Sequence, residues 1–476
     1  MDRGELPGYE FEVPHGSRHA GGPRHVAGHD SLRYLQHPSV PEPDAKSSVR
    51  SAGSGVLDVM RKRNWLMGLA APILAAIVVG IAVVVVTGGG GPTGAAPSAL
   101  AAGFPPARHA GSNFTGSATS RVILTAIGAS AATEVAAGGV NGGPALWTSS
   151  NGGTDWARAV LRGPTLLTRA GTGQFAGVAR GPAGWLAVGT TRGRNGRALV
   201  ASSADARTWT VTGSTAGLGK GDPAAVTAGP AGYVIVGHRS HGDSGAAVAA
   251  AWYAPGLTGW RPAVVTSAGH DSQTMNAVTA TAHGFVAVGA TGTSPAAWLS
   301  ATGKAWRQAR LPVPAGAARA ALDYVAANGS AVLAAGTEFS TAGASRPFAE
   351  ASADGGTTWT EVQLPVPDIG SGTGTTVTGL TAAGGGFTSV GTYVTKAGPE
   401  VVIWTLPPRT PVTDGAGWTA VTPQGTGLAG AKAENALTAI TVDGVTLTGV
   451  GFTAKLTASG TPGPQQPTLW QSPIRY

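Results

Sequence analysis

The chain contains no cysteine, and few of its residues are charged or aromatic. The lack of cysteine excludes disulfide bonds, thiolate nucleophiles and cysteine-ligated metals. It does not exclude an extracellular location, because a domain of this size buries enough apolar surface to be stable without disulfides. Only 12% of the residues are charged, and beyond residue 63 the basic ones occur singly, without the runs that follow a phosphate backbone. We therefore expect no nucleic-acid partner.

Glycine and proline, by contrast, are abundant. The chain has 75 glycines and 33 prolines among 476 residues. Both residue types are unfavourable inside helices and common in tight turns, so the composition favours many short strands. Alanine, threonine and valine are also frequent, a bias that resembles chains from high-GC actinobacteria. The length suits two or three ordinary domains or one large all-β domain.

One long apolar run is the most specific local signal. No charged residue occurs between Trp65 and Val86, and a helix of that length spans roughly 33 Å, enough to cross a bilayer core. Pro72 is compatible with a membrane helix, which can repair one missing hydrogen bond locally. We predict a transmembrane helix with a basic flank at 61–87. A cleaved signal peptide is the main alternative, with small residues at Ser98–Ala101, but sixty residues precede the run.

Basic residues indicate the orientation of this helix. Arg61, Lys62 and Arg63 precede it, and no charge follows until Arg108. The positive-inside rule then places the N-terminus in the cytoplasm and the C-terminal bulk outside the cell. Residues 1–60, which are rich in Gly, Pro and His without apolar periodicity, are predicted to be a disordered cytoplasmic tail. Residues 88–110 are predicted to be a flexible stalk.

Beyond about residue 110, one pattern repeats at intervals of about 46 to 59 residues. Each unit has an apolar strand, a glycine turn, a strand ending in Val-Gly, a variable loop, a third strand, another turn, and a strand that opens with Trp. These tryptophans are Trp156, Trp209, Trp260, Trp306, Trp359 and Trp418. Four-stranded units at this spacing are typical of propeller blades. We predict an all-β fold, a seven-bladed β-propeller over 111–476. Six or eight blades stay open alternatives, because the first unit is degenerate and the sixth has an insertion.

The last unit ends after its third strand, close to the C-terminal Tyr476. A four-stranded blade would then lack one strand, and an open sheet edge invites association with other chains. The stretch Gly111–Ser120, which precedes the first unit, has a short Thr/Ser/Phe pattern that suits an outer strand. We expect it to pair beside Thr468–Pro473 and tie the two ends of the ring together.

The octapeptide Ser352–Trp359, SADGGTTW, lies at the turn before a fourth strand. An Asp in this position accepts backbone hydrogen bonds, Gly adopts positive φ, and Trp covers the hairpin. The octapeptide resembles the Asp-box of sialidase-like proteins, the bacterial neuraminidase repeat S-x-D-x-G-x-T-W. Ser149–Trp156, Ser203–Trp209 and Ser300–Trp306 are weaker matches. In families that share this box it lies at the periphery, opposite the active site. The resemblance therefore implies a propeller and a structural role for the turn.

Catalytic signals are weak. The sialidases that this chain resembles use an arginine triad, a Tyr–Glu nucleophile pair and an Asp acid/base, and the Phe/Tyr-Arg-Ile-Pro signature of the first arginine is absent. Core or turn positions account more simply for the tyrosines of the propeller before the C-terminal residue, which are Tyr233, Tyr253, Tyr324 and Tyr393. We assign no catalytic residue and no cofactor. A sialidase-like or other glycoside hydrolase is kept as the alternative function.

Two polar segments have side chains that could form binding loops. One holds His238, His241 and Asp243, whose side chains suit a metal ion, and the other holds three arginines that suit an anion. Those arginines are Arg192, Arg194 and Arg197. A solvated loop explains either set more simply. We therefore predict no metal site and leave the ligand-binding residues unassigned.

The predicted loops between second and third strands are long and dissimilar, whereas the turns between third and fourth strands are short and alike. One face of the propeller is thus constant while the other is elaborated, and binding usually resides in loops on a rigid scaffold. We predict a single-pass membrane protein whose extracytoplasmic propeller is a non-catalytic binding or scaffolding module. Its partner would be a glycan or a surface protein.

Overall fold

A computed structural model of the chain describes residues 121–474, apart from 170, 193–195, 214–216, 242–245, 267–270, 367–373, 396–397, 424–432, 445 and 459–461. The predicted tail, membrane helix, stalk and closing strand, which together occupy 1–120, lie outside the described residues. Within the described part of the chain, no helix is long and apolar enough to cross a membrane.

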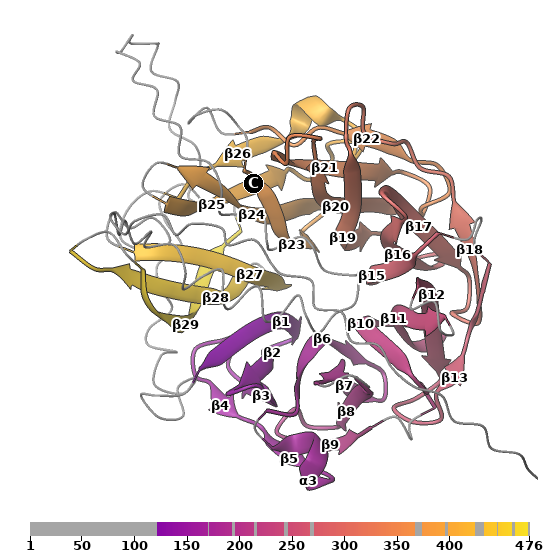
Figure 1. The fold of residues 1–476 in the computed structure, drawn as a ribbon, viewed down its shortest axis with the longest axis vertical. Coiled ribbons are helices and arrows are strands. Elements are labelled where there is room, and N and C mark those ends of the chain that lie inside the picture. Colours follow the sequence, from indigo (N-terminus) through magenta and orange to yellow (C-terminus); the bar gives the residue numbers. More distant parts are fainter. Residues whose placement is uncertain are drawn as a thin grey trace, which may run out of the picture. The chain divides into compact units, whose positions relative to one another are not determined.

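The described strands form seven separate sheets that follow one another along the chain. Figure 1 shows them around a common centre, each with its first long strand innermost. The first blade contains β1 (Val122–Ser130), β2 (Thr133–Val140), β3 (Gly143–Ser149) and β4 (Ala157–Arg158). The second contains β6 (Gly173–Gly181), β7 (Gly184–Thr191), β8 (Ala198–Ser203) and β9 (Thr208–Thr212). The third contains β10 (Gly221–Gly229), β11 (Gly232–His241), β12 (Ala246–Ala254) and β13 (Arg261–Pro262).

The remaining blades repeat this order. The fourth contains β15 (Gln273–Thr281), β16 (Gly284–Thr291), β17 (Ser294–Ser300) and β18 (Ala305–Ala309). The fifth contains β19 (Arg319–Asn328), β20 (Ala331–Phe339), β21 (Ser345–Ser352) and β22 (Thr360–Val362). The sixth contains β23 (Thr376–Ala383), β24 (Gly386–Thr395), β25 (Gly398–Leu406) and β26 (Thr419–Val421). The seventh contains β27 (Ala433–Asp443), β28 (Thr446–Leu456) and β29 (Pro462–Pro473).

The seven sheets close into a ring. Each innermost strand packs against the next, and β27 packs against β1. Side chains add bonds across this last junction: Thr438 Oγ1 donates to the Leu124 carbonyl (2.9 Å) and Gln471 Nε2 to the Gly152 carbonyl (2.6 Å). The predicted seven-bladed propeller is confirmed, and the alternatives of six or eight blades are wrong. The closing strand at Gly111–Ser120 lies outside the described residues and stays a prediction.

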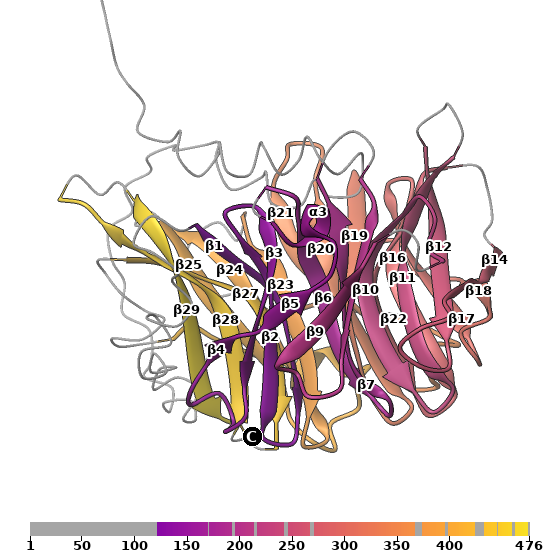
Figure 2. The same cartoon turned by 90° about the horizontal axis from the view of Figure 1, so that it is seen from below.

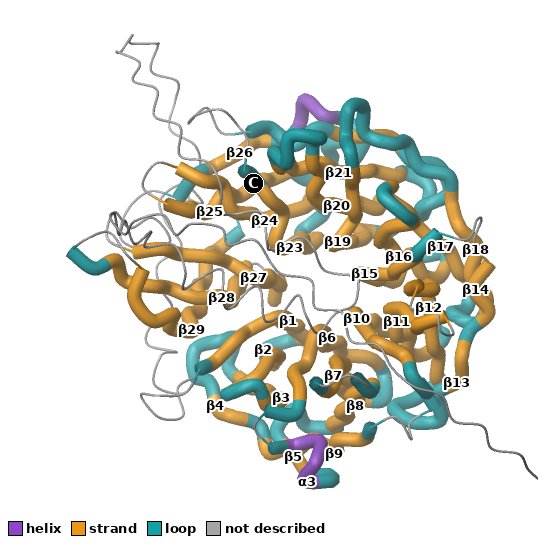
Figure 3. The backbone as a smooth tube through the Cα atoms, in the orientation of Figure 1, coloured by secondary structure: helices purple, strands orange, loops and turns teal. Residues whose placement is uncertain are grey.

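Two blades have a fifth strand that the repeat pattern did not predict. β5 (Val160–Arg162) runs parallel to β9, and β14 (Val264–Thr266) runs parallel to β18. Both belong to the connection from the preceding blade, and each covers part of an outer edge that would otherwise be open. Figure 3 shows that helix is confined to two short peripheral segments of the described chain, α3 (Thr165–Thr168) and the 3-10 turn η3 (Gly415–Gly417).

A recurrent glycine is explained by a bulge in the innermost strand of every blade. The second-strand glycines lie opposite the residue that precedes each bulge, and all seven are close to a carbonyl of that strand: Gly138, Gly189, Gly237, Gly289, Gly336, Gly391 and Gly451. A Cβ added at any of them would overlap that carbonyl oxygen. The Val-Gly signature therefore reflects close approach of two backbones rather than a need for positive φ.

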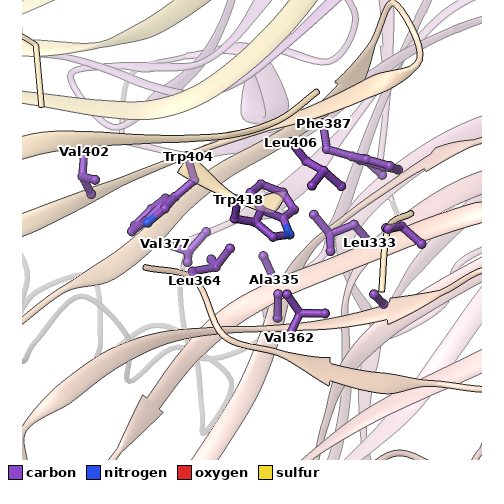
Figure 4. Close-up of a cluster of buried hydrophobic side chains, with 14 of the residues drawn as sticks. Leu333, Ala335, Val362, Leu364, Val377, Phe387, Val402, Trp404, Leu406 and Trp418 are labelled. Atoms are coloured by element: carbon purple, nitrogen blue, oxygen red, sulfur yellow. The ribbon is translucent and has the colours of Figure 1, made fainter. Parts of the chain in front are cut away.

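Apolar residues form layers between neighbouring blades rather than one central core. The layer between the fifth and sixth blades, for example, joins Leu333 and Ala335 of β20 to Val402 and Trp404 of β25 (Figure 4). Trp418, which opens the fourth strand of the sixth blade, is buried in the same layer. Alternate residues of one strand therefore contribute to two layers, which explains why the middle strands are almost continuously apolar.

Candidate functional site

The two ends of the blades differ, and we name them as two faces. The turn face carries the connections between first and second strands and between third and fourth strands. The loop face carries the connections between second and third strands and the crossings from blade to blade. Figure 2 shows the strands running between these two faces.

On the turn face, polar groups of the octapeptide Ser352–Trp359 hydrogen-bond to one another. Asp354 Oδ1 accepts hydrogen bonds from Ser352 Oγ (2.8 Å) and from the N–H groups of Thr357 and Thr358 (2.9 Å each). The indole N–H of Trp359 donates to the Gly356 carbonyl (2.7 Å). Burial opposes ionisation, but hydrogen bonds from Thr358 and its neighbours lower the pKa of Asp354 to about 2. The geometry matches the structural role expected from the sequence.

The first blade has an amide where the fifth has this carboxylate. Asn151 Oδ1 accepts from the N–H of Asp155 (2.9 Å), and Asn151 Nδ2 donates to Asp155 Oδ2 (2.8 Å). In the fifth blade the equivalent of Asp155 is Thr358, whose hydroxyl donates to Asp354 Oδ2 (2.7 Å). Each turn therefore pairs one donor with one carboxylate. The near match in the first blade is a compensated exchange and not a decayed turn.

On the loop face, the structure corrects the predicted long loops. β11 extends through His241, β20 through Phe339, and β28 through Leu456. The elaborated segments are therefore mostly longer hairpins, with short connections at their tips. They did not read as strands because they project beyond the blade layers, where polar side chains replace the apolar ones that mark a packed strand.

The two polar segments singled out from the sequence are neighbours on this face. Thr190 of β7 forms a side-chain hydrogen bond with Asp222 of β10, and Asp222 Oδ2 lies 3.6 Å from His238 Nε2 of β11. The His238 side chain is 12% exposed and that of Asp222 is 33% exposed. Burial lowers the pKa of His238 while Asp222 opposes the shift, so the imidazole is neutral near pH 7.

Sequence reasoning missed Asp222 as the partner of His238. The two residues are directly opposite in the β10–β11 hairpin, but the bulge at Ala224 shifts the register by one residue. Counting back from the Gly229–Gly232 turn would therefore pair His238 with Pro223. Asp243 and the side chain of His241 lie outside the described residues. In the described part of the chain, no group of three His, Cys, Asp or Glu side chains could hold a metal ion.

Three exposed arginines lie at strand ends on the same face. Arg192 and Arg197 flank the tip of the β7–β8 hairpin, and Arg239 is adjacent to His238. The Arg192 guanidinium leans toward Gly142 of the first blade, where an added Cβ would lie 3.0 Å from its Nη1. These three arginines form no ion pair with another described residue. Arg194, the third arginine of the predicted anion loop, lies outside the described residues.

The innermost strands contribute a polar ring that the sequence did not suggest. The residues at the seven bulges are Thr125, Ala176, Ala224, Asn276, Asp323, Thr378 and Thr438. All are half-buried. Three of them donate to the carbonyl just before the bulge of the next blade: Thr125 to Phe175 (2.7 Å), Asn276 to Leu322 (3.2 Å) and Thr438 to Leu124 (2.9 Å). Aligning the units on this apolar-x-small-apolar pattern would have revealed the ring.

Asp323 is the one acid among these seven positions. Its Oδ1 accepts from Asn276 Nδ2 (3.1 Å), while its Oδ2 is shielded from solvent and has no hydrogen-bond partner. Burial raises the pKa of Asp323 to about 7. A glycosidase that protonates a leaving group while stabilising charge on the sugar needs two carboxylates, and the bulge ring supplies a single one.

A tyrosine and a glutamate do meet in the sixth blade, as a sialidase nucleophile would require. The Tyr393 hydroxyl donates to Glu400 Oε2 (2.7 Å) across the β24–β25 pair. However, Tyr393 is only 5% exposed and belongs to the apolar layer between the fifth and sixth blades. Burial and Glu400 both raise the pKa of Tyr393. The pair therefore favours a neutral, packed phenol over an activated nucleophile.

Two further acids are buried near the turn face. Thr448 of the seventh blade donates to Glu134 Oε1 (2.8 Å), whereas Glu134 Oε2 has no partner. Glu350, opposite Glu361 on the β21–β22 pair, has no partner for either carboxylate oxygen. Burial raises the pKa of Glu134 to about 7 and, with Glu361, that of Glu350 to about 8. Burial thus favours the protonated form of both side chains.

Comparisons with known proteins find similar structures but no family for this chain. No family model matches the chain, and no curated protein matches it. It is similar in structure to YCF48 from Cyanidioschyzon merolae, at 14% identity and a TM-score of 0.43, over 74% of this chain and 96% of that one. The Hadza microbial sialidase Hz136 is similar at 10% identity and a TM-score of 0.39, over 78% and 68% of the two chains.

The periplasmic gluconolactonase of Pseudomonas aeruginosa is also similar, at 11% identity and a TM-score of 0.43, over 75% of this chain and all of that one (100%). Likeness at such identities concerns the fold alone, because one fold hosts many functions. The count of seven blades rests on the sheet topology described above.

Proposed function

We propose that this protein is a membrane-anchored, extracytoplasmic propeller that binds a glycan or a surface protein through its loop face, without catalysing a reaction. One observation carries the proposal. The turn face repeats a set of internally satisfied turns, whereas the loop face carries hairpins that differ from blade to blade and arginines that have no ion-pair partner among the described residues.

Retention of cell-envelope fragments by the purified protein tests this role. Soluble fragments of the protein's own cell envelope, labelled and added to the full-length protein in nanodiscs, should be retained by it. Retention should be lost when the loop face is blocked by a bulky group. If blocking the turn face abolishes retention and blocking the loop face does not, the assignment of the binding face is wrong.

The membrane topology is a separate part of the proposal, and it rests on Arg61–Arg63 and the uncharged run after them. Protease added to intact cells should remove the chain beyond about residue 110 and spare the N-terminal tail. Protection of the propeller with loss of the tail would reverse the orientation.

A glycoside hydrolase is the alternative, and the Tyr393–Glu400 hydrogen bond is the observation that favours it. A fluorogenic sialoside should not be cleaved by the protein if the phenol is only a packed core group. Cleavage that disappears in Tyr393→Phe, with unchanged thermal stability, would establish the alternative.

A further inference from the structure

Charge is distributed unevenly over the loop face. Six exposed cations lie on the loop face of the first three blades, at strand ends or, for Arg169, in the crossing between two blades: Arg121, Arg169, Arg192, Arg197, Lys220 and Arg239. The described acids of this region include one on the same face, Asp222, and it is already engaged by His238 and Thr190. We call these six cations the basic arc. None of them forms an ion pair with another described residue.

Two other surfaces of the propeller lack this excess of cations over acids. On the turn face of the same three blades, four cations are nearly matched by three acids: Arg158, Arg180, Arg207 and Arg261 with Glu134, Asp155 and Asp205. On the loop face of the fifth to seventh blades, the described cations and acids are equal in number: Arg319, Arg346 and Lys455 with Glu338, Glu400 and Glu434. The basic arc is therefore local to one half of one face, and the net charge of the chain does not account for it.

We propose that the basic arc binds an acidic polysaccharide, a linear chain that carries a carboxylate or sulfate on successive sugars. This rests on the proposed binding function and names the ligand class. Guanidinium groups recognise carboxylate and sulfate oxygens through paired hydrogen bonds. Unpaired cations on one surface attract such groups without first breaking internal ion pairs.

The spread of the cations favours an extended ligand over a small one. Arg192 leans over Gly142 in the first blade, Arg197 lies in the second, and Arg239 is in the third. A chain with regularly spaced charges can contact all three blades, whereas a single small anion would meet one cation at a time. Each contact is weak alone at a solvated surface, so the affinity comes from several acting together.

Nucleic acid fits this surface less well. Proteins that bind single strands stack bases on aromatic side chains, and the exposed large hydrophobic residues of the described chain are valines: Val160, Val264, Val313, Val366 and Val394. Among the described residues, no cation of the arc is accompanied by an exposed aromatic ring. A sugar polymer needs no such platform.

Full-length protein in nanodiscs of uncharged lipid would be passed over immobilised polygalacturonate, dextran sulfate, neutral dextran and duplex DNA. We expect binding to the two acidic polysaccharides, weaker binding as salt rises from about 50 to about 300 mM, and none to neutral dextran. The loop-face variant Arg192→Gln/Arg197→Gln/Arg239→Gln should bind about tenfold less tightly or worse. The turn-face variant Arg158→Gln/Arg180→Gln/Arg207→Gln, which has the same change in net charge, should stay within about twofold of the parent.

Three results would overturn the inference: no binding of the parent to either acidic polysaccharide, equal losses in the two variants, or tighter binding to DNA than to polygalacturonate. Failure of this inference can be distinguished from failure of the proposed function. If the loop-face variant still retains envelope fragments while losing polygalacturonate, the binding role stands and the ligand class is wrong.

Discussion

The turn face and the loop face of this propeller are built by opposite rules. On the turn face, Ser352, Asp354 and Trp359 hydrogen-bond within their own turn, and the same pattern recurs around Trp156, Trp209 and Trp306. On the loop face, hairpins differ in length, and the exposed cations of the basic arc have no ion-pair partner among the described residues. Features that repeat from blade to blade thus serve the fold, and features that vary are free to serve binding.

The comparison predicts that a substitution on one face changes stability and one on the other changes binding. The largest effect should follow from Trp209→Ala. This side chain is fully buried (0% exposed), and its indole N–H donates to the Ala206 carbonyl (2.8 Å). Removing a buried tryptophan should lower the free energy of unfolding by about 3–5 kcal/mol, measured by urea denaturation. Arg197→Gln should leave that free energy unchanged, and a loss above about 1 kcal/mol there would break the comparison.

A pH series should sharpen the comparison of the two faces. Glu134 and Glu350 are buried near the turn face, but they do not belong to the pattern that recurs from blade to blade. Their pKa values in the folded state, about 7 and about 8, exceed the ordinary 4.5. The folded form therefore keeps protons that the unfolded chain releases, so their stabilisation is complete below about pH 4.5 and is lost as pH rises through 7 to 8. The free energy of unfolding should fall between pH 5 and pH 8 by on the order of 2–3 kcal/mol for each group.

Glu134→Gln and Glu350→Gln should each flatten that slope. Asp354→Asn is the matched control, because the pKa of Asp354 is about 2 and the group does not titrate in this window. A double glutamine variant that kept the parent's slope would show that other groups carry the pH dependence.

The smallest effect concerns two versions of one turn. Asn151→Asp would place a second carboxylate against Asp155, in place of the present Nδ2 to Oδ2 hydrogen bond of 2.8 Å. We expect a loss of about 1 kcal/mol in the free energy of unfolding at pH 7. Adding Asp155→Thr, which copies the fifth blade, should restore most of it. Thermal denaturation of both single variants and the double variant measures this coupling, and additive losses would refute the compensated exchange.

Much of this architecture could be predicted from the sequence. The spacing of Trp156 to Trp418 and the Val-Gly strand ends fixed the blades, because both features recur wherever the same local packing recurs. The bulges were not predicted, since a bulge depends on the register between two strands and Asp323 has the local sequence of an ordinary strand residue. The partner of His238 was missed for the same reason. The long hairpins resemble loops in sequence because their polar residues face solvent on both sides.

Selective blocking of the two faces tests the central claim most directly, and the lack of native cysteine makes it clean. Arg197→Cys on the loop face and Arg207→Cys on the turn face place a single thiol on the same blade, each at an exposed position. Each variant would be conjugated to a large polyethylene glycol maleimide, and retention of cell-envelope fragments would be measured before and after conjugation. The account predicts that conjugation at Arg197→Cys abolishes retention and that conjugation at Arg207→Cys leaves it intact. Retention that survives at Arg197→Cys and is lost at Arg207→Cys would contradict it.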